Sequence, residues 1–329
     1  DCYLKDAREK PMDALQFFVH EKINDHFYHI TESYAPCRDP GFDNGSTFNI
    51  YVIIGEEKIA VIDTGLGATD GLRKYIEQNI GLDPNKPMIA LLGHCHPDHC
   101  GAATLFDEVH FNSGELQTLD WDSDIERRLS DLELFANYDQ EIIEFCKKHY
   151  VKGRITESYP YYLAEDGDII DLGGVKLTVV LLPGHSQGSV IYWNQEEHWA
   201  CGSDSVQILN SYRGGFDELE KYRRYLKRAI SLFPEDIQIY SGHDRIVHTK
   251  GTLYLMLESL EDILCGRNLS HDIPKPPRFA MTKPGPTMLI HRLGHIRSSY
   301  SSELWHNSHP ENSMSNEELI ELLIQEKGL

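Results

Sequence analysis

The sequence predicts an α/β fold, in which apolar strands form sheets and amphipathic helices pack against them. Short segments rich in β-branched and aromatic residues recur along the chain, and segments with apolar residues at helical spacing separate several of them. One fully apolar run, residues 88–92, suits a buried strand better than a helix. The 329 residues are sufficient for one large domain or two ordinary ones.

The individual elements follow from local patterns. Two strands are expected at residues 48–54 and 59–62, joined by a short glycine-containing turn. A helix is predicted at residues 69–79, where Asp70 would begin it and Gly81 would end it. Other strands are predicted at residues 26–30, 168–170, 175–182, 189–193, 199–201 and 237–240, and other helices at 216–232 and 252–264.

Residues 113–150 are predicted to form a helical insertion over the sheet scaffold. Leu129, Leu132 and Phe135 form one apolar stripe at helical spacing, and a second stripe follows around Phe145. Charged residues are frequent between the stripes.

The composition changes after residue 265, so we divide the chain into a larger domain, 1–265, and a C-terminal extension, 266–329. The extension is basic and Pro-rich, and then helical at residues 316–326. Prolines exclude a regular helix or a central strand from much of residues 271–300. Because this segment is basic on a chain of net charge −21, we expect it to pack near the pocket or to cross to a second subunit of a homodimer.

The overall composition restricts the partners and the compartment. The chain has 52 acidic and 31 basic residues, and this negative charge repels phosphate backbones, so nucleic acid is not an expected partner. No run of 18 apolar residues occurs, so no membrane span is expected. Seven cysteines, an odd number scattered over a long chain, do not indicate a disulfide framework. These features favour a cytoplasmic protein.

Four metal-ligand side chains follow the apolar run 88–92 within six residues, namely His94, His96, Asp98 and His99. In an extended chain, residues i and i+2 point the same way, so the first two can bind one metal ion. A turn at Pro97 can direct the other two towards a second ion. Imidazole and carboxylate ligands together favour zinc, with iron or manganese as alternatives.

The segment from His94 to His99 matches the H-x-H-x-D-H signature of the metallo-β-lactamase superfamily. Four further segments resemble the other motifs of this family in the same order: Val61-Ile62-Asp63-Thr64-Gly65, Pro183-Gly184-His185-Ser186-Gln187-Gly188-Ser189, Gly202-Ser203-Asp204-Ser205 and Ser241-Gly242-His243-Asp244. The resemblance implies a four-layer αββα sandwich of the metallo-β-lactamase type. Two central mixed sheets would have helices on both outer faces, and residues 1–265 would form the catalytic domain. The helical insertion and the C-terminal extension would be additions, which in this family often wall the substrate pocket.

The resemblance also implies two zinc ions per chain, with iron or manganese as alternatives. His94, His96 and His185 would bind one ion. The second ion would be bound by Asp98, His99 and His243, and Asp204 would bridge both. Asp63 would order the metal-binding loops from outside the ligand set.

By the same resemblance, the protein is expected to hydrolyse a thioester, ester or lactone through a hydroxide that bridges the two metals. The substrate would be a small molecule, with an anionic group that a basic residue of the extension could meet. Asp98 or Asp204 would carry the proton to the leaving group. The alternatives are a sulfur dioxygenase with one iron, a phosphodiesterase of the same fold, and a metal-stabilised binding module without catalysis.

Overall fold

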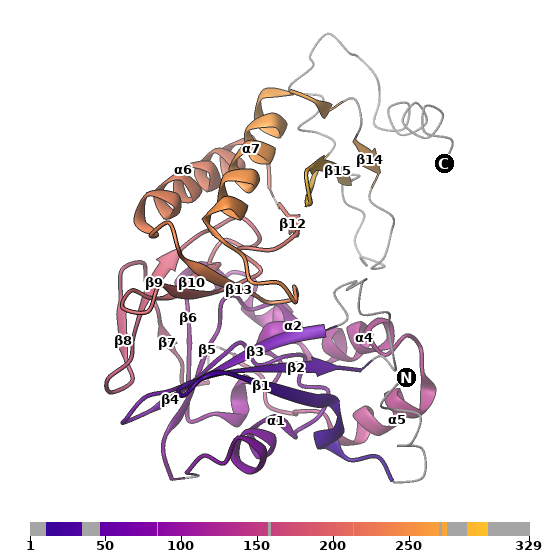
Figure 1. Ribbon diagram of the computed structural model, residues 1–329. Coiled ribbons are helices and arrows are strands. Elements are labelled where there is room, and N and C mark those ends of the chain that lie inside the picture. Colours follow the sequence, from indigo (N-terminus) through magenta and orange to yellow (C-terminus); the bar gives the residue numbers. More distant parts are fainter. Residues whose placement is uncertain are drawn as a thin grey trace.

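The computed structural model describes residues 11–34, 47–83, 85–156, 159–212, 214–269, 272–274 and 288–301. Two sheets pack face to face in this part of the chain, and helices cover both outer faces. Helix α1 (Leu72–Tyr75) lies against the first sheet, and α6 (Phe216–Leu232) and α7 (Lys250–Cys265) lie against the second (Figure 1). This arrangement confirms the expected four-layer αββα sandwich.

The first sheet is antiparallel from β1 to β4 and parallel from β4 to β7. The apolar run that the sequence assigned to a buried strand forms β5, and every residue of β4 and β5 is buried. In spatial order the strands are β1 (Phe18–Asn24), β2 (Phe27–Ser33), β3 (Thr47–Ile54), β4 (Ile59–Ile62), β5 (Met88–Leu91), β6 (Glu108–Phe111) and β7 (Tyr162–Leu163).

The second sheet is antiparallel except for the parallel pair β11 and β13. The first two of its strands in the chain form an antiparallel hairpin. Its spatial order is β13 (Gln238–Ser241), β11 (Trp199–Ser203), β10 (Val190–Asn194), β9 (Lys176–Leu181) and β8 (Ile169–Asp171). All predicted strands are therefore present with small shifts at their ends, whereas β1, β6 and β7 were not predicted.

Three apolar clusters hold the four layers together, because each sheet buries both of its faces. Between the sheets, the inner face of the first meets that of the second through Phe27, Ile62, Leu91, Val179, Tyr192 and Cys201. The other two clusters lie under α1 and under α6 and α7. Among the helices in the described part of the chain, none combines the length and the apolarity that crossing a membrane requires.

The helix predicted at residues 69–79 begins three residues later than expected. Its first residue is Leu72, and Asp70 does not cap it, since Gly71 occupies the N-cap position without a side-chain hydrogen bond. After Tyr75 the helix continues as a π-helix, Ile76–Ile80. Gly81 ends it with φ +76°, a left-handed conformation that glycine adopts at low cost, as predicted.

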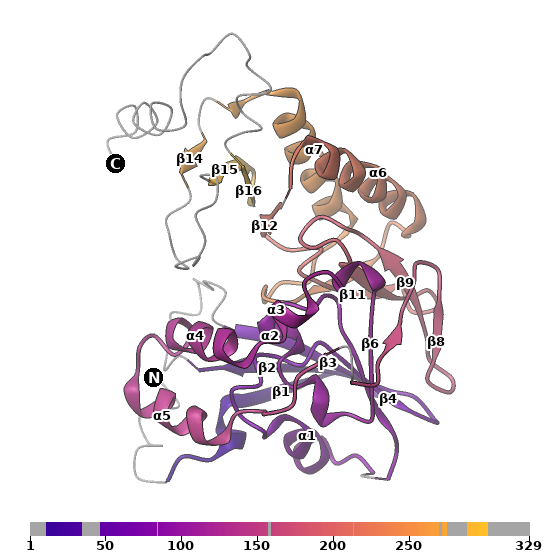
Figure 2. The same cartoon turned by 180° about the vertical axis from the view of Figure 1, so that it is seen from behind.

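The helical insertion is also confirmed. It comprises a 3-10 turn at Ser113–Glu115 and helices α3 (Leu119–Asp122), α4 (Ile125–Phe135) and α5 (Gln140–His149). Figure 2 shows α4 and α5 beside α2 (Pro97–Cys100), at one end of the first sheet. The buried Arg128 attaches α4 there, because its guanidinium donates to Gly101 O at 2.5 Å and to Val151 O at 2.9 Å.

The described residues of the C-terminal extension form strands that pack on the same chain. β14 (Ile273–Pro274), β15 (Met288–Leu293) and β16 (Ile296–Ser301) join β12 (Leu209–Ser211) in a third sheet, with β14 at an edge, where proline is tolerated. Leu289 and Tyr300 lie in the apolar cluster of α6 and α7. Residues 275–287 and 302–329, which include the predicted helix 316–326, lie outside the described residues, and the boundary at residue 265 stays a prediction.

A buried polar network holds this third sheet against α7. Asp272 accepts a hydrogen bond from the Tyr300 hydroxyl at 2.6 Å and lies 2.9 Å from Nδ1 of His291. The other ring nitrogen of His291 lies 3.6 Å from Asp262 of α7. All four side chains are buried, so each polar atom depends on its partners here rather than on water.

Tyr300→Phe should therefore destabilise the protein by about 1–3 kcal/mol, because it removes the hydroxyl group that donates to the buried Asp272 carboxylate. Chemical denaturation measures the change in the free energy of unfolding. The matched control is Tyr254→Phe on α7, where the ring is 48% exposed and the expected change is below about 0.5 kcal/mol. Equal stabilities of the two variants would show that the network does not hold the sheet.

Candidate metal centre

The polar residues singled out in the sequence come together where loops leave the strands of both central sheets. Four ligands, His94, His96, Asp98 and His99, follow β5, and Asp204 follows β11. The other two, His185 and His243, lie on the loops after β9 and β13. Such an edge can present ligands because the loops need not pair with neighbouring strands, while the sheets fix where each loop begins. The structure thus brings all seven predicted ligands to one place.

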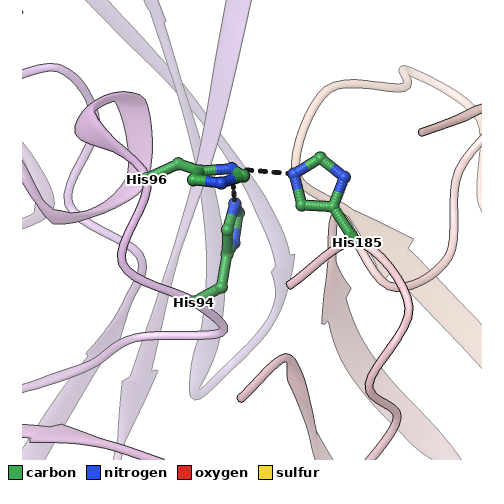
Figure 3. A group of neighbouring side chains, drawn as sticks. All are labelled: His94, His96 and His185. Atoms are coloured by element: carbon green, nitrogen blue, oxygen red, sulfur yellow. Dashed lines mark hydrogen bonds between the residues drawn. The ribbon is translucent and has the colours of Figure 1, made fainter. Parts of the chain in front are cut away.

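The first cluster consists of His94, His96 and His185. Nδ1 of His96 lies 2.9 Å from Nε2 of His94 and 2.8 Å from Nε2 of His185, and all three rings are buried (Figure 3). Two nitrogens bound to one tetrahedral zinc at about 2.0–2.1 Å would lie about 3.3–3.4 Å apart. The observed ring positions are close to that geometry, so a small outward shift of the rings would admit an ion.

The second cluster consists of Asp98, His99 and His243. Nε2 of His243 lies 3.3 Å from Nε2 of His99 and 3.4 Å from Oδ2 of Asp98. Oδ2 of Asp98 lies 3.7 Å from Nε2 of His99. These separations match the edges of a tetrahedron around one small cation.

Asp204 lies between the clusters and faces both. Its Oδ2 is 3.4 Å from Nε2 of His185, and its Oδ1 is 3.4 Å from Nε2 of both His99 and His243. Among the described residues, no hydrogen-bond donor is directed at the buried Oδ1. His94, His99 and Asp204 also form a possible ligand group of their own, which places the two clusters side by side. A buried carboxylate oxygen without a donor fits a position beside a cation.

Local structure explains how the ligands of the segment from His94 to His99 reach both clusters. His96 is still extended, with φ −63° and ψ 154°, whereas Pro97 begins the short helix α2. Proline is favoured at this first helical position, because it has no N–H and its φ is already helical. The chain therefore turns between His96 and Asp98, as the sequence predicted, and Asp98 and His99 point to the second cluster.

Asp63 connects three of the segments that form the site. Its Oδ2 lies 2.9 Å from Nδ1 of His99 and accepts a hydrogen bond from Ser203 Oγ at 2.7 Å, while Oδ1 accepts from Gly93 N at 2.8 Å. Asp63 adopts a left-handed conformation with φ +57° at the end of β4. A carboxylate on one ring nitrogen fixes the ring orientation and leaves the other nitrogen directed at the ion.

The charges of the site favour a cation. Burial lowers the pKa of His99, but the negative charges of Asp204, Asp98 and Asp63 outweigh this effect and raise it to about 9. Burial keeps the pKa of His94 well below its usual value, so this imidazole is neutral, as a metal ligand must be. Nitrogen and carboxylate donors in a buried, negatively charged site are the ligand set that zinc prefers.

The sequence model of the family described as the metallo-beta-lactamase superfamily matches residues 46–243. This range includes the seven predicted ligands and Asp63. The chain belongs to this superfamily. Its metallo-hydrolase character agrees with the two clusters of histidine and aspartate, which are consistent with a binuclear metal site.

Known members of the superfamily differ in how much of the chain they match. Acyl-coenzyme A thioesterase MBLAC2 of Homo sapiens is 28% identical over 205 residues, which are 59% of this chain and 68% of that protein. Hydroxyacylglutathione hydrolase of Methylobacterium nodulans is 34% identical over 82 residues, 25% of this chain and 32% of that protein. A metallo-beta-lactamase family protein of Thermus thermophilus superposes with a TM-score of 0.53 at 22% identity, over 77% of this chain and 85% of that one, which shows a shared fold.

The insertion reaches the second cluster through two aromatic side chains. The ring of Phe48 packs edge-on against His243, with ring centroids 5.7 Å apart, and against Phe135 of α4, with centroids 4.8 Å apart. The insertion thus supports the position of His243. Its role in walling a substrate pocket stays a prediction.

Sequence reasoning missed several residues that hold the ligand loops. Ser203 donates to Asp63, Asn49 donates to Ser241 O at 3.0 Å and Asp244 O at 2.8 Å on either side of His243, and Glu115 joins two loops. Ser203 is adjacent to Asp204 within a family motif, which was a usable signal. Asn49 and Glu115 lie outside the motifs, and their sequence neighbours give no indication of their contacts.

Asp63→Asn should weaken metal binding by about 10–100-fold, because one of its two terminal atoms would be an NH₂ group that faces either the Gly93 N–H or the donors of Ser203 and His99. Titration of the metal-free protein with Co²⁺ against a competing chelator measures this affinity. Asp236→Asn is the matched control, since it removes an aspartate that lies 2.8 Å from a histidine, His198, at the surface. Equal affinities in the two variants would contradict the orienting role of Asp63.

Proposed function

We propose that this protein is a zinc-dependent hydrolase that cleaves a thioester, with esters and lactones as the other candidate substrates. His94, His96 and His185 would bind one zinc ion. Asp98, His99 and His243 would bind the second, and Asp204 would bridge the two. Asp98 and Asp204 are the proposed catalytic carboxylates, and Asp63 orients His99.

The position of Asp204 is the observation that carries the proposal. Each of its oxygens lies 3.4 Å from ring nitrogens of a different cluster, so one carboxylate can serve two ions. A structural zinc site is a closed cage of four protein ligands, and a shared carboxylate between two open clusters does not fit that pattern. The arrangement supports a catalytic two-metal centre rather than a metal-stabilised binding module.

Two bound divalent ions would supply a hydroxide nucleophile at neutral pH and would polarise the carbonyl group of the substrate. The chain's own residues would set the geometry and move the proton. The side chain of Asp98 is 19% exposed and that of Asp204 is 7% exposed, so Asp98 is the carboxylate that a leaving group reaches more readily. We therefore assign proton transfer to the leaving group to Asp98, and charge balance between the ions to Asp204.

The thioester preference is supported by the relatives. The acyl-coenzyme A thioesterase matches the chain over 68% of its own length, and hydroxyacylglutathione hydrolase matches a shorter segment. Both names denote hydrolases of acyl compounds.

Metal analysis and a substrate panel test the proposal together. Purified protein should contain about two zinc ions per chain and should hydrolyse acyl-CoA or acylglutathione thioesters faster than lactones or bis(p-nitrophenyl) phosphate. One iron per chain with oxygen-dependent sulfur oxidation would instead support the dioxygenase. Turnover of the phosphodiester alone would support the phosphodiesterase, and no turnover of any substrate would support the binding module.

Asp204→Ala should lose about one metal ion per chain and at least about 100-fold in kcat/KM, because the ions lose both a ligand and the charge between them. Elemental analysis and the thioester assay measure the two effects. The control is Asp217→Ala at the exposed start of α6, which should keep both ions and full activity. An Asp204→Ala variant with two ions and undiminished turnover would remove the proposed mechanism.

A further inference from the structure

Glu115 is a buried carboxylate that belongs to neither metal cluster. It lies in the 3-10 turn Ser113–Glu115, directly after β6 and at the start of the helical insertion, and it is only 1% exposed. Its Oε2 accepts a hydrogen bond from Cys95 N at 2.8 Å. Its Oε1 accepts from Gly188 N at 2.8 Å and from Ser186 Oγ at 2.6 Å.

These three donors lie on the two segments that carry the first cluster. Cys95 stands between His94 and His96, and Ser186 follows His185. The segments are far apart in the sequence, yet the nitrogens of His96 and His185 are 2.8 Å apart. One carboxylate therefore links the backbone of one ligand segment to the backbone of the other. Charge-assisted hydrogen bonds of this kind are roughly twice as strong as neutral ones.

The backbone of the turn is fixed independently of the ligand segments. Asn112 Oδ1 accepts from Gly114 N at 3.0 Å, and Asn112 Nδ2 donates to Ala164 O at 3.0 Å. The turn also touches the His185 segment directly, since a Cβ atom added at Gly188 would lie 2.7 Å from Glu115 N. Glu115 is thus held on a rigid support from which its side chain reaches both ligand segments.

We propose that Glu115 is a positioning residue that sets the spacing of His94, His96 and His185, and with it the metal affinity of the first cluster. The inference rests on the proposed function only in that this cluster holds a metal ion. A carboxylate is required because both of its oxygens must accept hydrogen bonds. An amide at this position would place an NH₂ group against a backbone or hydroxyl donor.

The test is Co²⁺ binding to the metal-free protein, followed by its visible absorption and by competition with a chelator. Glu115→Ala and Glu115→Gln should each weaken one of the two sites by about 10–100-fold and leave the other within twofold of the wild type. Glu115→Gln keeps the volume of the side chain, so its Co²⁺ affinity can still be measured if the alanine variant does not fold. Unchanged affinity at both sites in the folded variants would overturn the inference.

A double-mutant cycle identifies which site is affected. In a His185→Ala background the first cluster is already disabled, so adding Glu115→Gln should cause no further loss at the remaining site. A further tenfold loss there would show a general effect on the fold and would also overturn the inference. The matched control is Asp272→Asn, which alters a buried carboxylate with two partners in the C-terminal sheet and should lower stability but not Co²⁺ affinity.

The same measurements separate this inference from the proposed function. Wild-type protein that binds only one Co²⁺ would contradict the two-metal centre, whatever Glu115 does. If the wild type binds two Co²⁺ ions and the folded Glu115→Gln variant binds both with unchanged affinity, only the proposed role of Glu115 is contradicted. Inactivity towards thioesters would affect only the substrate assignment.

Discussion

The structure depends on the burial of negative charge among imidazole rings at one edge of the sandwich. Asp63 and Asp204 are buried, and Asp98 lies between the rings of His99 and His243. Taking a carboxylate out of water costs several kcal/mol unless a cation or several donors replace the water. Asp63 has its donors within the protein, whereas Oδ1 of Asp204 faces only ring nitrogens. A cation at this position would compensate the charge.

The αββα sandwich meets this constraint by bringing loops from both sheets to one edge. The apolar residues between the sheets fix where each strand ends, and the loops then need only a few polar contacts to place their ligands. Gly93 illustrates the close approach, since a Cβ atom there would lie 2.3 Å from Cβ of Ser203. Asp63 and Glu115 supply the contacts for different loops. The proposed metal ligands are therefore held by two other buried carboxylates, whose own donors include backbone amides and serine hydroxyls.

The insertion and the C-terminal sheet are attached to this scaffold by buried polar groups as well as by apolar packing. Arg128 donates to carbonyl groups that flank the insertion, and His291 lies between two aspartates under the third sheet. The third sheet also reaches the metal centre, because Ile208 accepts from Arg297 N through its carbonyl and donates to Asp244, the residue after His243. The third sheet is thus joined by hydrogen bonds of the Ile208 backbone to the loop that carries His243.

The sequence by itself determined the ligand residues, the strands that precede them and the superfamily. These features are local: a strand is encoded by its own apolar residues, and a motif by residues a few positions apart. Only the tertiary structure decided that Asp204 faces both clusters, that Glu115 joins two ligand segments, and that residues 288–301 form strands on α7. These contacts include pairs that are far apart in the sequence: Asp204 faces His99, Glu115 accepts from Ser186 at a separation of 71 positions, and β16 pairs with β12. The sequence pattern indicates which side chains can make such contacts, but the packing of the folded chain determines which residues become their partners.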